Sequence, residues 1–529
     1  MPHAPLRRIA AVLVATLSVA SFCSCSSSSG GRGTRPSGTD PPAGLRAPPG
    51  STTSVPTTAA PATSAPPLPV NPVGWLPCGA GLECGIVAAP LDYSHPQGRV
   101  IGISVERHKA TDPAHRIGSL VINPGGPGDS GIDDLPTELR ILTPDLLARF
   151  DIVSFDPRGV GRSSPIHCST GQAGPTSVAV TPSLLPDPVP QNDTERQQMV
   201  DENRAYALAC QRVSGDLLPF VGTVDAARDL DRIRAAVGDD QLTFLGHSYG
   251  TLLGATYAEM FPGRTRAMVL DGAIDPALSL AQMSLVQAEG FDASLQQFFT
   301  WCRSSPACAW RPAGDSYAAL GALMAAVRAT PLPAGGSRHA GPGELYLAVL
   351  DTLYARSFWP SLGRALAAAA QGGGGPLVAL SDGYRQHGSP NSNALDAMAA
   401  INCLDHPTSR DSASYAEAAA NATRQAPFFG PVFAWGALEC ATWAVPPTRQ
   451  PHPISAIGAP PILVVGTTGD PATPYAWAVA LAGELQRGVL VTRQGVDHVA
   501  YYYSACVRAI DARYLIDGTT PAPGTTCAS

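Results

Sequence analysis

The feature that most constrains the fold is a lone serine between two glycines, where a strand-like segment turns into a helix-like one. The stretch LTFLGHSYGTLLGATYA, residues 242–258, opens with apolar residues, closes with small and apolar residues, and carries Gly246-His247-Ser248-Tyr249-Gly250 between them. Such a turn strains its central residue, leaves no room for bulky neighbours, and exposes the serine hydroxyl above a sheet at a helix N-terminus. Gly-x-Ser-x-Gly alone occurs by chance, but the flanking strand and helix make Ser248 the candidate nucleophile.

Strand-like and helix-like segments alternate on both sides of this turn. Short apolar runs typical of strands occupy residues 119–123, 150–155, 265–271, 461–465 and 489–492. Residues 225–237 have helical spacing, and the alternation predicts a mostly parallel sheet covered by helices on both faces. From about residue 276 to 453 the chain looks helical, as in residues 278–302 and 343–370, and contains no clear strand. We therefore predict one α/β domain, residues 75–275 and 454–529, interrupted by a helical insertion over residues 276–453.

A nucleophilic serine needs a base, and the base needs an orienting acid. Asp470 and His498 each follow a predicted strand, so both should lie at the same edge of the sheet as Ser248. Asp before Pro is more often a turn residue or a helix cap, but chain order and position together predict a Ser248–His498–Asp470 triad. Asp497 is a rival acid, although as the direct neighbour of His498 it should point elsewhere. His247 adjoins Ser248, so its side chain should diverge and either pack or line the site.

A tetrahedral intermediate would need hydrogen-bond donors for its oxyanion. The N–H of Tyr249, directly after the nucleophile, is one candidate. The other is expected from the glycine-rich loop Asn123-Pro124-Gly125-Gly126-Pro127-Gly128, where Gly126 is our choice and Gly125 the alternative. An ordinary Gly/Pro turn is the rival interpretation, but the position after a strand and upstream of the serine favours the oxyanion role.

The first residues of the chain predict export. Arg7 and Arg8 precede an apolar run too short to span a bilayer, which is typical of a signal peptide in residues 1–25. Cleavage could follow Ala20, or Cys25 could instead carry a lipid, although Phe22 is atypical of a lipidation motif. Residues 26–74 are mostly Ser, Thr, Gly, Pro and Ala and should form a disordered linker between a membrane or wall and the folded body.

Ten of the twelve cysteines lie beyond the signal region, and an even number in an exported chain predicts disulfides. Pairing of sequence neighbours would give Cys78–Cys84, Cys168–Cys210, Cys302–Cys308, Cys403–Cys440 and Cys506–Cys527, although sequence alone does not fix this pairing. A metal site is the rival interpretation, but the cysteines form no CxxC pairs. We therefore predict neither a metal nor a cofactor.

Six motifs stand together in one order: NPGGPGDSG (123–131), FDPRGVGRS (155–163), DAARDLDRIR (225–234), GHSYGT (246–251), GTTGDPATP (466–474) and GVDHVA (495–500). Together they resemble the secreted tripeptidyl-aminopeptidase-like α/β-hydrolases, relatives of prolyl aminopeptidases. The resemblance runs from about residue 75 to the C-terminus. It implies the α/β-hydrolase fold with a helical cap, exopeptidase or related serine hydrolase activity, and Ser248, Asp470 and His498 as nucleophile, acid and base. The chain departs from the family pattern at Asp129, where glycine or alanine is more usual, and at Ala444, where proline is expected.

Three functions remain open: an exported aminopeptidase, a carboxylesterase or lipase with the same triad, and a catalytically silent hydrolase fold that serves as a surface binding protein. The intact triad weighs against the third. An aminopeptidase needs a carboxylate for the substrate's ammonium group, and Asp405 and Glu439 are the candidates, although a solvated surface acid is the commoner interpretation of either one.

The predicted substrate is a peptide or an acyl ester, and an N-terminal lipid would tether the protein to a membrane. The net charge of −7, without a basic run, argues against a nucleic-acid partner.

Overall fold

The computed structural model describes residues 68–168, 183–386 and 392–528. The predicted signal region with Cys25, and most of the predicted linker, lie outside the described residues.

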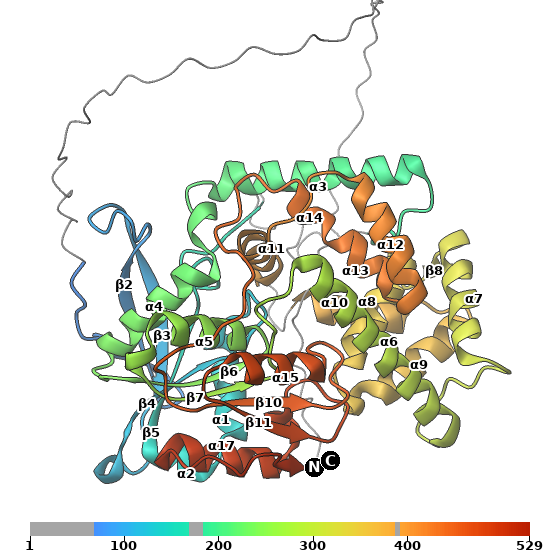
Figure 1. Ribbon diagram of the computed structural model, residues 1–529. Coiled ribbons are helices and arrows are strands. Elements are labelled where there is room, and N and C mark those ends of the chain that lie inside the picture. Colours follow the sequence, from blue (N-terminus) through green and yellow to red (C-terminus); the bar gives the residue numbers. More distant parts are fainter. Residues whose placement is uncertain (1–67, 169–182, 387–391, 529) are drawn as a thin grey trace, which may run out of the picture.

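A ten-stranded sheet forms the centre of the molecule (Figure 1). Its strand order is β1-β2-β3-β5-β4-β6-β7-β10-β11-β12, antiparallel from β1 to β5 and parallel from β5 to β12. The strands are β1 (Leu76–Gly79), β2 (Leu82–Pro90), β3 (Val100–His108), β4 (Gly118–Asn123), β5 (Phe150–Phe155), β6 (Leu242–His247), β7 (Thr265–Asp271), β10 (Ile462–Thr467), β11 (Gly488–Arg493) and β12 (Thr526–Cys527). Strands β4, β5, β6 and β10 are buried along their whole length, as expected for parallel strands covered on both faces.

Helices cover both faces of this sheet, above and below it in Figure 1. Alternate strand residues point into two separate cores: Val121 belongs to one, and Leu120 and Ile122 belong to the other. The helices on the Val121 side are α4 (Thr223–Ala236), α5 (Tyr249–Met260) and α15 (Tyr475–Glu484). Those on the opposite side are α1 (Gly131–Ile141), α2 (Pro144–Arg149), α16 (Ala500–Tyr503) and α17 (Ala505–Asp517). The predicted α/β architecture is therefore confirmed.

The chain between β7 and β10 forms the helical insertion, which stands at one end of the sheet in Figure 1. Its elements are α6 (Leu280–Ser304), α7 (Ser316–Ala329), β8 (Leu332–Pro333), β9 (His339–Ala340), α8 (Pro342–Leu353), α9 (Trp359–Ala370), α10 (Gly375–Gln386), α11 (Ala394–Asp405), α12 (Ala413–Gln425), α13 (Gly430–Gly436) and α14 (Leu438–Ala441). Helix α6 begins at a capping box formed by Ser279 and Gln282.

Two details of the insertion differ from the sequence analysis. The segment expected to contain no strand holds the short hairpin β8–β9, whose strands are too short to show a hydrophobic period. The helical stretch expected over residues 343–370 is broken into α8 and α9. Pro360 stands in the first turn of α9, where proline is favoured, and it could not have continued α8.

Helix α3 (Asp193–Ser214) lies between β5 and β6 in the chain and runs along the top of the molecule in Figure 1. The sequence analysis made no prediction for it. Its surface is mostly polar, and its buried residues, although at helical spacing, are few and include Ser214, so the apolar stripe is weak.

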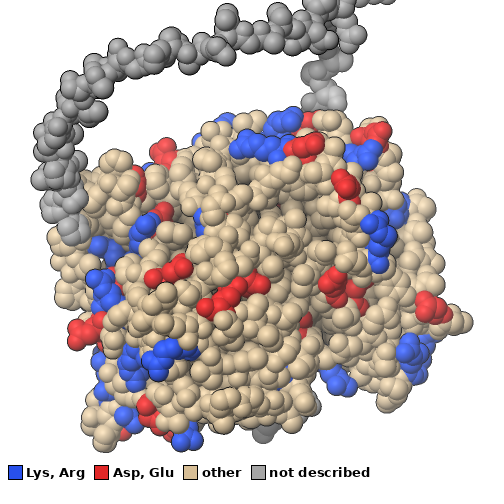
Figure 2. Space-filling model, in the orientation of Figure 1, with Lys and Arg blue, Asp and Glu red and all other residues tan. Residues whose placement is uncertain are grey.

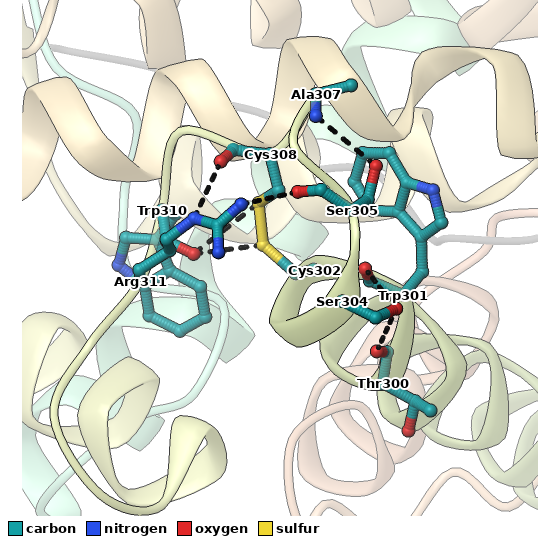
Figure 3. The surroundings of a disulfide bond; sticks show 9 residues. All are labelled: Thr300, Trp301, Cys302, Ser304, Ser305, Ala307, Cys308, Trp310 and Arg311. Atoms are coloured by element: carbon teal, nitrogen blue, oxygen red, sulfur yellow. Dashed lines mark hydrogen bonds between the residues drawn. A yellow bond between two sulfur atoms is a disulfide. The ribbon is translucent and has the colours of Figure 1, made fainter.

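The ten cysteines of the body form five disulfides, between the same neighbours that the sequence suggested. Figure 3 shows the bond between Cys302, near the end of α6, and Cys308 in the loop that follows. In that loop Arg311 donates to the carbonyl of Ser305 at 2.6 Å and to that of Cys308 at 3.3 Å. The disulfide and the arginine thus hold the loop against the end of the helix.

Acidic and basic side chains are interspersed over the face of the molecule drawn in Figure 2. Within the part of the chain that the structure describes, no helix combines the length and the apolar character that a membrane crossing requires.

Candidate active site

Ser248 occupies the turn between β6 and α5. Its φ of 54° and ψ of −122° lie outside the regions that residues other than glycine usually adopt, and its side chain is buried. Its N–H donates to the carbonyl of Asp271 at the end of β7, at 2.8 Å. A Cβ at Gly246 would lie 2.4 Å from the carbonyl oxygen of Gly250, so the turn has no room for a side chain there. This is the local geometry predicted for the nucleophile elbow.

Asp470 and His498 form a buried pair on the loops after β10 and β11. The Nδ1 of His498 lies 2.9 Å from Oδ1 and 3.0 Å from Oδ2 of Asp470. The N–H groups of Ala472 and Thr473 donate to Oδ1 of the same carboxylate at 3.0 and 2.9 Å. With Nδ1–H directed at the carboxylate, the lone pair of the imidazole lies on Nε2, as a general base requires.

Ser248 and His498 both lie near the end of β7. Asp271 binds the N–H of Ser248, and a Cβ on the next residue, Gly272, would lie 3.3 Å from Cε1 of the His498 ring. The Ser248 Oγ and the His498 Nε2 are both buried and form no hydrogen bond with any described residue. The acid–base pair is therefore assembled, while the bond between base and nucleophile is not formed. Such bonds commonly tighten only when a substrate binds.

The two rival residues have other partners. Asp497 accepts from Arg493 at 2.7 Å and from the N–H of Arg356 at 2.8 Å, so its carboxylate serves these groups rather than His498. His247 lies with Nδ1 at 2.8 Å from the hydroxyl of Tyr502 and packs against that ring. Both side chains thus diverge from the site.

The glycine-rich loop after β4 lies directly against the elbow. A Cβ on Gly125 would stand 2.9 Å from Cβ of Ser248 and 3.1 Å from the backbone nitrogen of Tyr249. The N–H of Gly125 donates to Oδ1 of Asn123 at 3.2 Å. The structure thus places Gly125 against the elbow with its N–H engaged by Asn123, and the choice of Gly126 as the partner of Tyr249 in an oxyanion hole stays a prediction.

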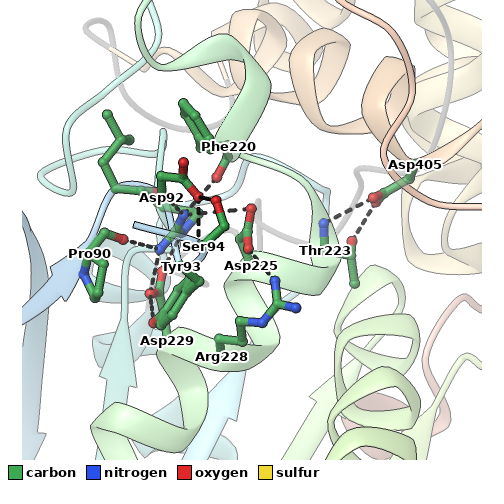
Figure 4. Close-up of polar contacts among 12 residues, drawn as sticks. Pro90, Asp92, Tyr93, Ser94, Phe220, Thr223, Asp225, Arg228, Asp229 and Asp405 are labelled. Carbon is green, nitrogen blue, oxygen red and sulfur yellow. Dashed lines mark hydrogen bonds and ion pairs between the residues drawn. The ribbon is translucent and has the colours of Figure 1, made fainter. Parts of the chain in front are cut away.

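Asp405, a predicted amine ligand, ends α11 and is 1% exposed. Its Oδ1 accepts from the N–H of Thr223 at 2.9 Å, and its Oδ2 accepts from the hydroxyl of Thr223 (Figure 4). Burial raises the pKa of Asp405 to about 6, although the bonds from Thr223 oppose the shift. Both oxygens are bonded within the protein, which argues against the predicted contact with a substrate amine.

Glu439, the other predicted amine ligand, lies near the start of α14 and is buried. Its neighbourhood includes Tyr206, whose hydroxyl donates to Oδ1 of Asp396 at 2.7 Å. Burial, followed by the negative charges of Asp396 and Glu439, raises the pKa of Tyr206 well above its ordinary value. The structure therefore places two carboxylates together inside the cap, and the role of Glu439 stays a prediction.

The sequence analysis missed three residues that support the site. Thr473 Oγ1 lies 3.2 Å from Nδ1 of His498, and its place in the motif after Asp470 could have pointed to it. The backbone carbonyl of Tyr354, in the insertion, accepts from the backbone N–H of His498 at 2.9 Å, and the Tyr354 ring packs edge-on against the imidazole. Thr223 binds Asp405, and nothing in the sequence beyond its position at a helix start indicated this.

Comparisons with known proteins show which family the chain belongs to. Residues 426–527 match the family described as TAP-like protein. The chain is 38% identical over 488 residues to "Serine protease Hip1" of Mycobacterium tuberculosis, covering 86% of this chain and 91% of that one. It is 35% identical over 460 residues to "Carboxylesterase B" of the same species, covering 84% and 86%. It is 32% identical over 479 residues to "Tripeptidyl aminopeptidase" of Streptomyces lividans, covering 86% of each.

Among solved structures, the acetyl esterase MekB matches with a TM-score of 0.39 and 12% identity, over 83% of this chain and 94% of that one. A likeness this low adds nothing to the sheet topology described above. The sequence relatives, in contrast, match along most of their length. The chain therefore belongs to the tripeptidyl-aminopeptidase-like serine hydrolases of the α/β-hydrolase superfamily.

Proposed function

We propose that this protein is an exported serine peptidase that releases short peptides from free N-termini. The observation that carries the proposal is the buried Asp470–His498 pair beside the strained Ser248, in a chain whose relatives include a serine protease and a tripeptidyl aminopeptidase. We place the cap at about residues 276–453 and expect it to restrict the site to a chain end. Helix α11 of the insertion lies against the oxyanion loop, since the carbonyl of Ala394 would stand 2.4 Å from a Cβ on Gly128.

The reaction follows the acyl-enzyme route. The Ser248 hydroxyl attacks the scissile carbonyl while His498 Nε2 takes its proton, and Asp470 stabilises the resulting imidazolium. The N–H groups of Gly126 and Tyr249 bind the oxyanion. His498 then protonates the leaving amine, and a water molecule, activated by the same imidazole, hydrolyses the acyl-enzyme and restores the serine.

Export is supported by the five disulfides, which form and persist in oxidising compartments. The signal-like residues 1–25 support the same conclusion. Lipid attachment at Cys25 would hold the enzyme at a membrane, and cleavage after Ala20 would release it. Mass spectrometry of the N-terminal peptide from the exporting cell decides between the two.

A carboxylesterase that uses the same triad is the second candidate, because one relative at 35% identity is named "Carboxylesterase B". The two activities share every catalytic residue and differ in what the cap binds. A panel of free peptides, N-acetylated peptides and acyl esters separates them. Faster turnover of esters than of any peptide would make the protein an esterase.

The nucleophile is tested by the variant Ser248→Ala. We expect it to lose turnover on every substrate of the panel and to lose covalent labelling by a fluorophosphonate, while its circular dichroism stays that of the wild type. Labelling that persists in the folded variant would remove Ser248 from the mechanism, and the proposed function with it.

A further inference from the structure

A buried chain of hydrogen bonds runs from the cap to the residue after the nucleophile. Asp405, at the end of cap helix α11, binds both the N–H and the hydroxyl of Thr223, the first residue of α4 (Figure 4). The hydroxyl of Thr223 lies 2.5 Å from the hydroxyl of Tyr249. Side chains at all three positions are buried, so water does not compete for these bonds.

The direction of the bonds follows from the protons present. A threonine hydroxyl carries one proton, and Thr223 donates it to Oδ2 of Asp405. The bond between Thr223 and Tyr249 must then use the proton of the tyrosine, with Thr223 Oγ1 as acceptor. With Asp405 ionised, the chain runs from the Tyr249 hydroxyl through Thr223 to the carboxylate, and it fixes the far end of the tyrosine ring.

The backbone of the same tyrosine is part of the site. Tyr249 is the first residue of α5, so its N–H has no acceptor within the helix. That N–H is the proposed oxyanion donor, and it lies beside Gly125 of the glycine-rich loop. Because the Tyr249 ring is held at its hydroxyl end, the first turn of α5 can shift less. This matters because an oxyanion donor loses much of its effect when it is displaced by a fraction of an ångström.

Helix α11 also contacts the other half of the proposed oxyanion hole. Asn393, which precedes the helix, donates to the carbonyl of Gly159 and accepts from the N–H of Gly161, each at 2.9 Å. Ala394 lies against Gly128 in the loop that provides Gly126. One end of this cap helix therefore adjoins the loop that provides Gly126, and the other end is linked to Tyr249 through Thr223 of α4.

We propose that Asp405 and Thr223 are positioning residues, which act through the Tyr249 side chain to hold its backbone N–H in the oxyanion hole. The cap then contributes to catalysis by hydrogen bonding to the core, in addition to covering the site. The inference rests on the proposed function, since it takes Ser248 as nucleophile and Tyr249 as donor.

The test compares Tyr249→Phe, Thr223→Val and the double variant on two substrates, a free peptide and an acyl ester without an amine. Removal of one oxyanion donor lowers kcat by about 10²–10³-fold, so a displaced donor should cost about tenfold. We expect that loss in kcat on both substrates, with KM nearly unchanged. The double variant should be no worse than either single variant because both remove the same bond. Thr223→Ser, which keeps the hydroxyl, should restore kcat.

Tyr257→Phe is the matched control. Tyr257 lies on the same helix, is equally buried and uses its hydroxyl to bind Asp231 at 3.3 Å, away from the serine. We expect its kcat to equal that of the wild type. Asp405→Asn should lower kcat on the ester as well as on the peptide.

Three results would overturn the inference. They are an unchanged kcat in Tyr249→Phe, additive losses in the double variant, and an Asp405→Asn effect confined to KM for free peptides, which would make Asp405 the amine ligand. The proposed function fails separately, through retained activity in Ser248→Ala measured in the same assay.

Discussion

At the scale of single residues, two aspartates near His498 offer a matched comparison. Asp470 binds Nδ1 of the imidazole, whereas Asp497 binds Arg493 and the N–H of Arg356. We expect Asp470→Asn to lower kcat by about 10⁴-fold, as in serine proteases, because an amide cannot hold the imidazole in the required tautomer. Asp497→Asn should leave kcat within about twofold. Initial rates of the two variants on one ester and one peptide measure these changes in kcat. A larger loss of kcat in Asp497→Asn than in Asp470→Asn would mean that the acid has been misassigned.

At the scale of elements, the disulfide between Cys403 and Cys440 joins α11 to α14. Its removal should destabilise the protein by about 2–5 kcal/mol, because the bond closes a long loop between two buried helices. The pair Cys78 and Cys84 is the control, since it closes only a short, exposed hairpin and should cost less when both are changed to serine. Scanning calorimetry of the two double-serine variants gives the comparison. An equal loss of stability in both would show that loop length does not govern the effect.

The elements that the sequence predicted well are those with strong local patterns. The strands β5 and β7 begin and end at the residues expected, because each is a short apolar run bounded by turn residues. The antiparallel strands β1 to β3 were not predicted. Burial alternates only in the second half of β2, whereas in β3 Ile101, Ile103 and Val105 alternate with more exposed residues, a strand pattern that the sequence analysis missed. At Gly85 of β2, Val73 and Trp75 from the preceding segment pack so closely that a side chain would not fit, a contact that no local pattern records.

At the scale of the whole molecule, the predicted triad residues follow β6, β10 and β11, because parallel strands deliver their carboxyl ends to one edge. Chain order and position after a strand are what predict their roles, and these roles stay predictions. The link between Thr223 and Asp405 could not be predicted in this way, since the two residues are 182 positions apart and meet only when the cap is seated on the core. The sequence analysis therefore proposed that Asp405 binds the substrate's ammonium group, whereas in the structure its carboxylate accepts hydrogen bonds from Thr223.

The predicted contact between Glu439 and the substrate's ammonium group can be tested by enzyme kinetics. If the cap binds the substrate's ammonium group through this buried carboxylate, Glu439→Gln should raise KM for free peptides about tenfold or more, because a buried cation would lose its counter-charge. Acyl esters carry no amine, so their kinetics should not change. Equal rates of wild-type enzyme on free and acetylated peptides would exclude an amine site anywhere in the cap.

The way in which α11 packs against the core has a consequence for protein engineering and for divergence within the family. Every residue of this helix is buried, and its ends bond to Thr223 on one side and to the loop at Gly159 on the other. The insertion is therefore not an interchangeable module. A chimera that receives the cap of a relative would need matching residues on both sides of the junction, and substrate preference should evolve more readily through the other cap helices than through this one.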